Sequence, residues 1–174
     1  MTVSQTSELA GEHTTRAGWV TAGALMGAVA GVILAMFDVI MAWIMGNGFF
    51  MPLRMIGAIA LGEEALEPSY SLLTAGVVGL LVHMVLSIIL GAIAGTVIAA
   101  VTLLQTNAVV LVIATTIFGF LLWIVNFFVI APAAFEWFTM ADDVVQFVAH
   151  TFFFGMALGL LLIGWHRSRS RLSD

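Results

Sequence analysis

Cysteine is absent from this sequence of 174 residues, which excludes disulfide bonds, thiolate metal sites and cysteine nucleophiles. Lysine is absent as well, and the five basic residues are all arginines. Charged residues make up only 9% of the chain, whereas an average soluble domain has about 25%. Nucleic-acid binding needs a basic patch with interleaved aromatic residues, and the sequence contains none, so we expect no nucleic-acid partner.

Long apolar runs are what this chain has in excess, with 62% hydrophobic residues and a mean hydropathy of +1.15. Four runs, residues 18–45, 75–104, 108–130 and 144–165, contain few or no charges. At ~1.5 Å of rise per residue, each forms a helix long enough to cross the ~30 Å hydrocarbon core of a bilayer. The sequence therefore predicts an all-α integral membrane protein whose four spans form an antiparallel bundle. The short turn at 105–107 predicts that the second and third spans pack as a hairpin.

The polar ends of the chain lie outside this single four-span domain, residues 18–165. Residues 1–17 carry acidic residues ahead of their only arginine, the wrong order for a signal peptide, so we predict an uncleaved, disordered tail. Residues 166–174 form a second, basic tail. The two tails hold four of the five arginines, and the positive-inside rule therefore places both termini in the cytoplasm.

The first outer loop contains a short apolar segment. Pro52 suits the first turn of a helix and Gly62 its end, so residues 52–61 are predicted as a short helix at the interface or in a shallow re-entrant dip. Arg54 is the only arginine on the outer side. If this helix folds over the mouth of the bundle, the long Arg54 side chain reaches Asp38 or Glu136. The alternative is a solvent-facing arginine that pairs loosely with the acidic run after the helix.

Small residues recur at helical spacing on three of the four spans. At intervals of four residues they line one side of a helix, and another backbone can then approach closely where no hydrophobic effect drives association. We predict helix-packing faces there, with one ridge left over to dock another membrane protein or a second copy. The residues are Gly23, Gly27, Gly31 and Ala35 on the first span, Gly91 and Gly95 on the second, and Gly155 and Gly159 on the fourth.

The two halves of the chain also share a pattern. A seven-residue gap separates Gly31 from Asp38 and, in the third span, Gly119 from Asn126. In each half the following span carries a histidine ahead of its pair of glycines. We therefore interpret the chain as two related helical hairpins, an arrangement that internal repeats of membrane proteins also show.

Each span carries one polar side chain at a similar distance from the predicted outer boundary. An ionisable side chain inside the membrane is costly and needs a partner. We therefore predict that these side chains meet near the outer face, with the two histidines opposite each other and Asp38 opposite Asn126. The predicted cluster consists of Asp38, His83, Asn126 and His150, together with Ser87, Gln146 and, from the loop above, Arg54.

Several functions are open for this cluster. It is a structural hydrogen-bonded network if Asp38 accepts from the imidazoles. It is a b-type haem site if His83 and His150 are axial ligands, or a divalent-metal or proton site if both histidines and Asp38 act together. Ser87 beside His83 is the only pair suited to hydrolysis. Our prediction is a non-catalytic membrane subunit or scaffold, without a cofactor, that packs with a larger complex or with itself.

One part of the sequence resembles a known group of proteins. The segment GNGFFMPLRMIGAIALGEEAL, followed by GLLVHMVLSIILGAIAG, resembles small bacterial inner-membrane proteins with four helices. These share a Gly-Phe-Phe-x-Pro-Leu-Arg loop and a His-x-x-x-Ser motif at the start of the second helix. The resemblance implies the four-span architecture and the bacterial inner membrane, and it implies no activity. The matching positions are Pro52, Leu53, Arg54, His83 and Ser87.

Overall fold

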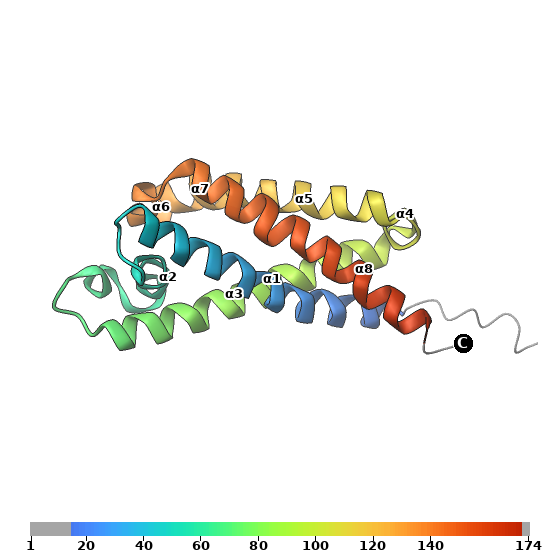
Figure 1. Ribbon diagram of the computed structural model, residues 1–174, viewed down its shortest axis with the longest axis horizontal. Helices are drawn as coiled ribbons and strands as arrows, with labels where there is room; N and C mark the ends of the chain where they lie inside the picture. Colours follow the sequence, from blue (N-terminus) through green and yellow to red (C-terminus); the bar gives the residue numbers. More distant parts are fainter. Residues whose placement is uncertain (1–14, 172–174) are drawn as a thin grey trace, which may run out of the picture.

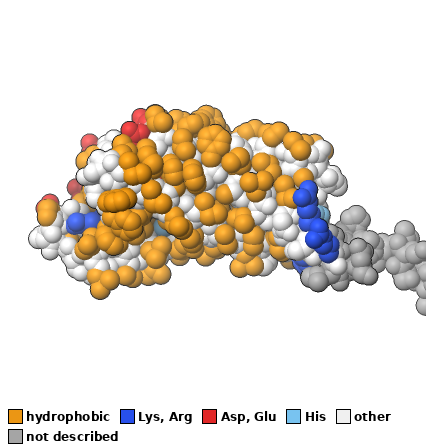
Figure 2. All heavy atoms as spheres, viewed as in Figure 1, with side chains coloured by type: hydrophobic (Ala, Val, Ile, Leu, Met, Phe, Trp, Pro, Cys, Tyr) orange, Lys and Arg blue, Asp and Glu red, His pale blue; other side chains and the backbone are white. Residues whose placement is uncertain are grey.

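The computed structural model describes residues 15–171, and this part of the chain is helical, with no strand. Four helices are long and apolar enough to cross a membrane: Arg16–Ile44, Leu72–Ala100, Ala108–Ala134 and Asp143–Arg169. Figure 2 shows one face of the molecule, which is apolar along its middle, with most basic side chains at one end and the acidic ones, together with a basic side chain, at the other. An apolar body with charges confined to its ends fits a membrane protein.

The four long helices are built from these elements, with a short helix or turn in each connection. The first span is α1 (Arg16–Ile44), followed by α2 (Met51–Leu61) and the 3₁₀ turn η2 (Glu63–Leu66). The second is α3 (Leu72–Ala100), followed by α4 (Thr102–Thr106). The third is α5 (Ala108–Ile124), the π-helical η3 (Val125–Ile130) and α6 (Ala131–Ala134), followed by the 3₁₀ turn η4 (Glu136–Met140). The fourth is α7 (Asp143–Val148), the π-helical η5 (Ala149–Met156) and α8 (Ala157–Ser170).

Each span begins at a polar residue whose side chain satisfies backbone N–H groups of the first turn, as helix starts require. Asn107 Oδ1, for example, accepts from the N–H groups of Val109 and Val110 at 3.1 Å. Because these caps follow polar loops, they set where each apolar helix starts. The capping residues are Thr15, Ser71, Asn107 and Asp142.

Two predicted boundaries are wrong. The third span does not end at residue 130 but continues through Pro132 to Ala134, and Pro132 closely follows the π segment η3. The last helix does not end at residue 165 but continues to Ser170, into the predicted basic tail. Most of the predicted N-terminal tail, residues 1–14, lies outside the described residues, as do residues 172–174.

The spans pack in two pairs joined by a central contact. The first pair, here the N-terminal hairpin, is α1 with α3; the second, the C-terminal hairpin, is α5–η3 with α7–η5–α8. The helix α1 also packs along η5 and α8, and this contact holds the hairpins together (Figure 1). The predicted packing of the second span on the third is wrong, because α3 and α5 are joined by α4 yet make few contacts.

Glycines make the crossing of the N-terminal hairpin very close. A Cβ atom on Gly27 would meet the Ser87 oxygen at 2.6 Å and the Gly91 Cα at 2.7 Å, and one on Gly23 would meet the Gly95 Cα at 2.9 Å. Real Cβ atoms are not found so close to backbone atoms, so only glycine fits. Gly31 continues the row and would meet the Ser87 side chain.

The C-terminal hairpin crosses in the same way, with fewer glycines. A Cβ on Gly119 would lie 2.9 Å from the Gly155 Cα, and one on Gly155 would lie 2.5 Å from the Thr115 oxygen. Gly159 completes the row and packs against Thr115 and Val112. Both glycine pairs of the second and fourth spans are therefore used inside the bundle. The prediction of a spare glycine ridge for a partner is wrong, since all of these glycines pack against other helices of the same chain.

The short helix α2 lies between α1 and α3 at the loop end, where those two helices diverge (Figure 1). It begins with Pro52 in its first turn, as predicted. A Cβ on Gly57 would meet the Ala75 oxygen at 2.5 Å, and Gly79 of α3 packs on the backbone of Leu53. The helix α2 thus packs on the first two turns of α3, and its residues Met51, Pro52, Met55, Ile56 and Ile59 line the cavity described below.

The main apolar core lies at the opposite end, near the described termini. Trp19 is 1% exposed and packs against Trp165, with ring centroids 5.3 Å apart, and against His166 at 5.1 Å. These residues belong to α1 and α8, so the first and last spans end at the same end of the molecule. The loop end has only a small apolar cluster, Ala58, Ala65 and Ala75, and it contains a cavity.

Candidate functional site

A cavity of about 430 Å³ lies between the two hairpins at the loop end. It extends from the two histidines to loop residues, and helices of both hairpins line it. Polar side chains from five elements face it, although they are far apart in sequence. They are Asp38 of α1, His83 and Ser87 of α3, Asn126 of η3, Gln146 of α7 and His150 of η5, and the loop residues Asn47 and Asp142 line the cavity as well.

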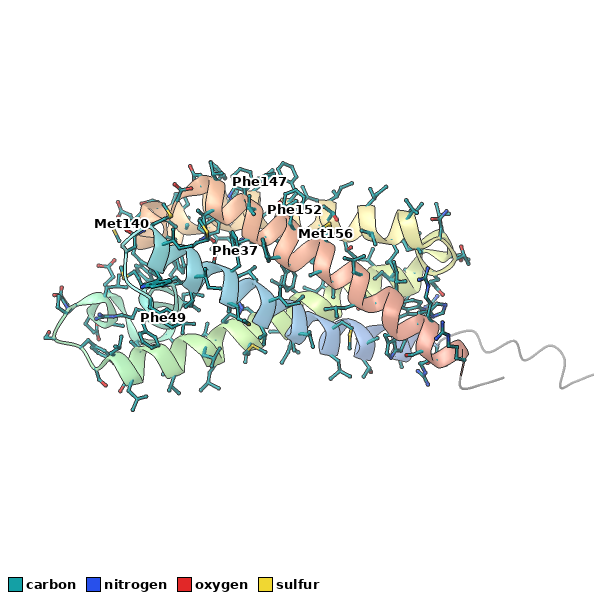
Figure 3. All side chains as sticks on the ribbon, in the orientation of Figure 1. Phe37, Phe49, Met140, Phe147, Phe152 and Met156 are labelled. Atoms are coloured by element: carbon teal, nitrogen blue, oxygen red, sulfur yellow. The ribbon has the colours of Figure 1, made fainter. Side chains whose placement is uncertain are left out.

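The rest of the wall is apolar and rich in methionine and phenylalanine. Methionine is flexible and polarisable, so such walls adapt to ligands of different shape. Met140, at the loop end in Figure 3, belongs to this wall. The methionine and phenylalanine residues that line it are Met45, Met51, Met55, Met140, Phe127, Phe135, Phe138 and Phe154.

Asp38 is the only ionisable carboxyl group at the deep end of the cavity, and it is only 7% exposed. Its Oδ1 accepts a hydrogen bond from Gln146 Nε2 at 3.4 Å, which is long for such a bond. Neither imidazole donates to it among the hydrogen bonds of the described residues. The predicted network in which Asp38 binds the histidines is therefore wrong, although all these side chains reach one cavity.

The reason is that backbone carbonyl groups take up the imidazole N–H groups. His83 Nε2 lies 2.8 Å from the Gly31 oxygen, which the missing glycine side chain leaves accessible. A carbonyl oxygen only accepts, so Nε2 carries the proton and donates. Ser87 Oγ is 3.5 Å from the same nitrogen. Since Nε2 is already protonated, it does not act as a base toward Ser87, and the geometry gives no support to hydrolysis.

His150 is held by its other nitrogen. Its Nδ1 donates to the Gln146 oxygen at 3.0 Å, and the Phe127 ring packs edge-on at 5.4 Å. The same logic makes Nδ1 the protonated nitrogen, so Nε2 is an acceptor. The two histidines thus bind backbone carbonyl groups through different nitrogens.

The haem alternative receives no support from this arrangement. Two axial ligands must each direct an unprotonated nitrogen at one iron atom, but the Nε2 of His83 donates to Gly31. The described residues also hold no group of three or more His, Asp or Glu side chains that could bind a metal ion. The set of two histidines and Asp38 is therefore not gathered as a metal site needs.

Arg54 does not join the cluster. Its Nε donates to the Ala65 oxygen at 2.9 Å, and its Nη2 donates to the Glu67 oxygen. The prediction that Arg54 reaches Asp38 or Glu136 is wrong, because α2 directs the side chain to the loop that follows it. Two backbone carbonyls of η2 and its end satisfy the guanidinium there, and Arg54 instead fixes the loop.

Sequence reasoning missed two features of the site. The first is the pair of π segments, which contain Asn126 and His150; π turns are rare and recur at functional sites. The second is a bridge between the hairpins, in which Trp137 Nε1 donates to the Met55 oxygen at 2.9 Å. The spacing from His150 to Gly155, one residue longer than that from Ser87 to Gly91, was the available signal for the second π segment.

Comparison with models of protein families, with curated proteins and with solved structures finds no match to this chain. The resemblance to small bacterial inner-membrane proteins therefore stays a prediction, and function is argued from the site itself.

Proposed function

We propose that this chain is a non-catalytic membrane protein that binds an amphiphilic small molecule in the cavity between its two hairpins. The observation that carries the proposal is the convergence of six polar side chains at one place in an otherwise apolar bundle. Binding sites of this kind combine an apolar wall with a few polar groups that orient the ligand. The cavity has this composition, since a mostly apolar wall surrounds a few polar side chains.

The subunit or scaffold role stays a second candidate. Its original support, a spare glycine ridge, is gone because the glycines pack within the chain. What still favours association is apolar surface, since Leu73, Val109 and Val144 are 77%, 68% and 69% exposed. Lipid covers such side chains equally well, so this observation favours binding to a protein less than the cavity favours a ligand.

The location proposed for the protein is the bacterial inner membrane, with both termini in the cytoplasm. Exposed Arg167, Arg169 and Arg171 at one end and exposed acidic residues at the other support this orientation. The chain has no cysteine, so each single-cysteine variant carries only one site for a thiol-reactive label. Ser69→Cys and Ser168→Cys, both at exposed positions, should label from opposite sides of the membrane. Labelling of both from one side contradicts the four-span topology.

Small molecules released from the purified protein test the binding proposal. Protein extracted from its membrane should carry one compound in near-stoichiometric amount, detectable by mass spectrometry. Leu122→Trp, which fills the cavity, should abolish it, whereas the neighbouring Leu121→Trp, at a residue 50% exposed on the outer surface, should not. The absence of such a compound from the wild type, or its retention by Leu122→Trp, contradicts the proposal.

A further inference from the structure

We infer that the ligand of this cavity is an amphiphilic organic cation, with its positive group beside Asp38 and its apolar body along the methionine and phenylalanine wall. This inference rests on the proposed function and names the ligand class for the same site. It follows from the charge of the cavity, the hydrogen-bonding state of its polar groups and the composition of its wall.

The charged side chains of the cavity are all acidic. Asp38 lies at the deep end and Asp142 near the loops, and no arginine is among the residues that line the cavity. The nearest candidate, Arg54, donates to the Ala65 and Glu67 carbonyls of its own loop. A phosphate, sulfate or carboxylate head would therefore enter without a cationic partner, and a buried unpaired charge is strongly unfavourable.

Asp38 has spare capacity to bind a positive group. Its side chain is buried, yet its one hydrogen bond, from Gln146, is 3.4 Å long and engages only Oδ1. A carboxylate has about four lone-pair sites in its two oxygens, so most of this capacity is unused. A cation placed within about 4–6 Å of a carboxylate favours its ionised form. The bound cation would supply the charge partner that the protein lacks.

The neighbouring polar groups also favour a cation over an anion. Both imidazoles direct their N–H groups at backbone carbonyls, His83 at Gly31 and His150 at Gln146. Neither N–H is therefore available to an anionic ligand. The remaining His150 Nε2 is an acceptor, and His150 lines the same cavity as Asp38. The polar end thus combines these acceptors with the side chains of Asn126, Gln146 and Ser87, which donate as well as accept, and it holds no cationic group.

The wall suits the apolar body of such a ligand. Aromatic faces attract cations through their quadrupoles, and Phe127, Phe135 and Phe138 line the cavity. A hard metal ion such as Mg²⁺ or Ca²⁺ would use neither these rings nor the methionine thioethers, which suit soft ions. The described residues also hold no cluster of three acidic or histidine ligands for a metal ion. The combination of a buried carboxyl group, Asp38, with an aromatic and methionine wall indicates a bulky organic cation.

Two ions of equal shape and opposite charge test this inference. Tetraphenylphosphonium and tetraphenylborate are compared by equilibrium dialysis on the full chain in phosphatidylcholine nanodiscs. Binding to the site is defined as the amount of bound ion that is lost in Leu122→Trp. Leu121→Trp is the matched control, and empty nanodiscs measure how much of each ion partitions into lipid. Wild-type protein should show site binding for tetraphenylphosphonium and little or none for tetraphenylborate.

Asp38→Asn, which keeps shape and removes charge, should weaken tetraphenylphosphonium binding at least about tenfold. Asp143→Asn removes a charge from an exposed position outside the cavity lining and should change it less than about threefold. A melting temperature of Asp38→Asn at or above that of the wild type shows that loss of binding is not loss of fold.

Equal site binding of both ions, or unchanged binding by Asp38→Asn, overturns the cation inference and identifies the site as one for neutral amphiphiles. No site binding of either ion also overturns it. In both cases the compound released from wild-type protein but not from Leu122→Trp still decides the proposed function, so the two failures are distinguishable.

Discussion

The two hairpins solve the same packing problem with different helices. In the N-terminal hairpin, Gly27 packs on the Ser87 oxygen and the Gly91 Cα through uninterrupted α-helices. In the C-terminal hairpin, Gly119 packs in the same way on the His150 oxygen and the Gly155 Cα. The two contacted residues are four apart in the first case and five apart in the second.

The π segment η5 accounts for this difference. An α-helix brings residues four apart onto one face, whereas the i→i+5 bonding of a π turn accommodates one more residue. The segment Ala149–Met156 contains both His150 and Gly155, so the extra residue is absorbed between them. The comparison teaches that a repeat is preserved in space where its sequence spacing differs.

Deleting one residue should affect the two hairpins in opposite ways, and this is the largest effect expected. Removal of Val85 from α3 rotates His83 relative to Ser87 by about 100°, out of the shared face. We expect loss of folded protein, measured as monodisperse yield and thermal unfolding in detergent. Removal of Phe152 from η5 should restore α-helical spacing and leave a folded protein. Equal damage by both deletions contradicts the equivalence of the hairpins.

An added methyl group tests the closeness of the helix crossing. In Gly91→Ala the new Cβ would lie 2.7 Å from the Gly27 Cα, so the helices must separate. Overpacking of this kind destabilises by about 1–3 kcal/mol or more. The control Gly76→Ala places its Cβ 4.0 Å from a Phe50 ring atom, an ordinary contact. A lower melting temperature for the first variant only is expected, and tolerance of both would mean that the crossing is looser than described.

Asp38 and Asn126 occupy matching positions, seven residues after Gly31 and Gly119, but only Asp38 is acidic. Exchanging the side chains at these two positions tests this difference. Asn126→Asp adds a second carboxyl group to the cavity and should destabilise by about 1–3 kcal/mol. Asp38→Asn relieves the burial of a poorly bonded carboxyl group and should leave stability unchanged or raised. Thermal unfolding without ligand measures both. A marked loss for Asp38→Asn would mean that Asp38 is a structural residue.

Variants of Arg54 test whether this residue stabilises its own loop or covers Asp38 in the cavity. Arg54→Ala removes hydrogen bonds to the Ala65 and Glu67 carbonyls and should cost about 1 kcal/mol. Combined with Asp38→Asn, the changes in unfolding free energy should add, since the two residues do not contact each other. Recovery of stability in the double variant would restore the interpretation in which Arg54 covers Asp38.

The smallest effect is expected at the bridge between the hairpins. Trp137→Phe removes the hydrogen bond to the Met55 oxygen and should cost about 0.5–1.5 kcal/mol. Trp43→Phe, at a residue 68% exposed, is the control and should have no effect on thermal unfolding. Identical melting curves for the two variants would show that the loops do not hold the hairpins together.

The sequence predicted the four apolar helices because membrane spans are specified by length and composition alone. It also predicted α2, since Pro52 and Gly62 are local signals. The depth of polar residues along each span brought Asp38, His83, Asn126 and His150 to a similar level, with Ser87 and Gln146 one turn away. All six line the cavity. Depth depends only on the rise per residue, and for this reason it is readable without a structure.

Local hydrogen-bond choices were not readable. Whether His83 donates to Asp38 or to the Gly31 carbonyl depends on how closely α1 approaches α3, which a sequence does not state. The direction of Arg54 depends likewise on the orientation of α2. The small contact between α3 and α5 could not be predicted from their short connection. A tight turn joins two helices at one end but does not require them to pack along their length.

Protection of cysteines in the two hairpins by one ligand is the most direct test of a cavity shared between them. Leu90→Cys of α3 and Asn126→Cys of η3 both line the cavity, and the chain has no other cysteine. Reaction of each with methyl methanethiosulfonate is measured at increasing tetraphenylphosphonium, with Val125→Cys, at a residue 44% exposed, as control. We predict that both lining positions are protected at the same half-saturating concentration and that position 125 is unaffected. Protection of only one hairpin, or of neither, would contradict the account.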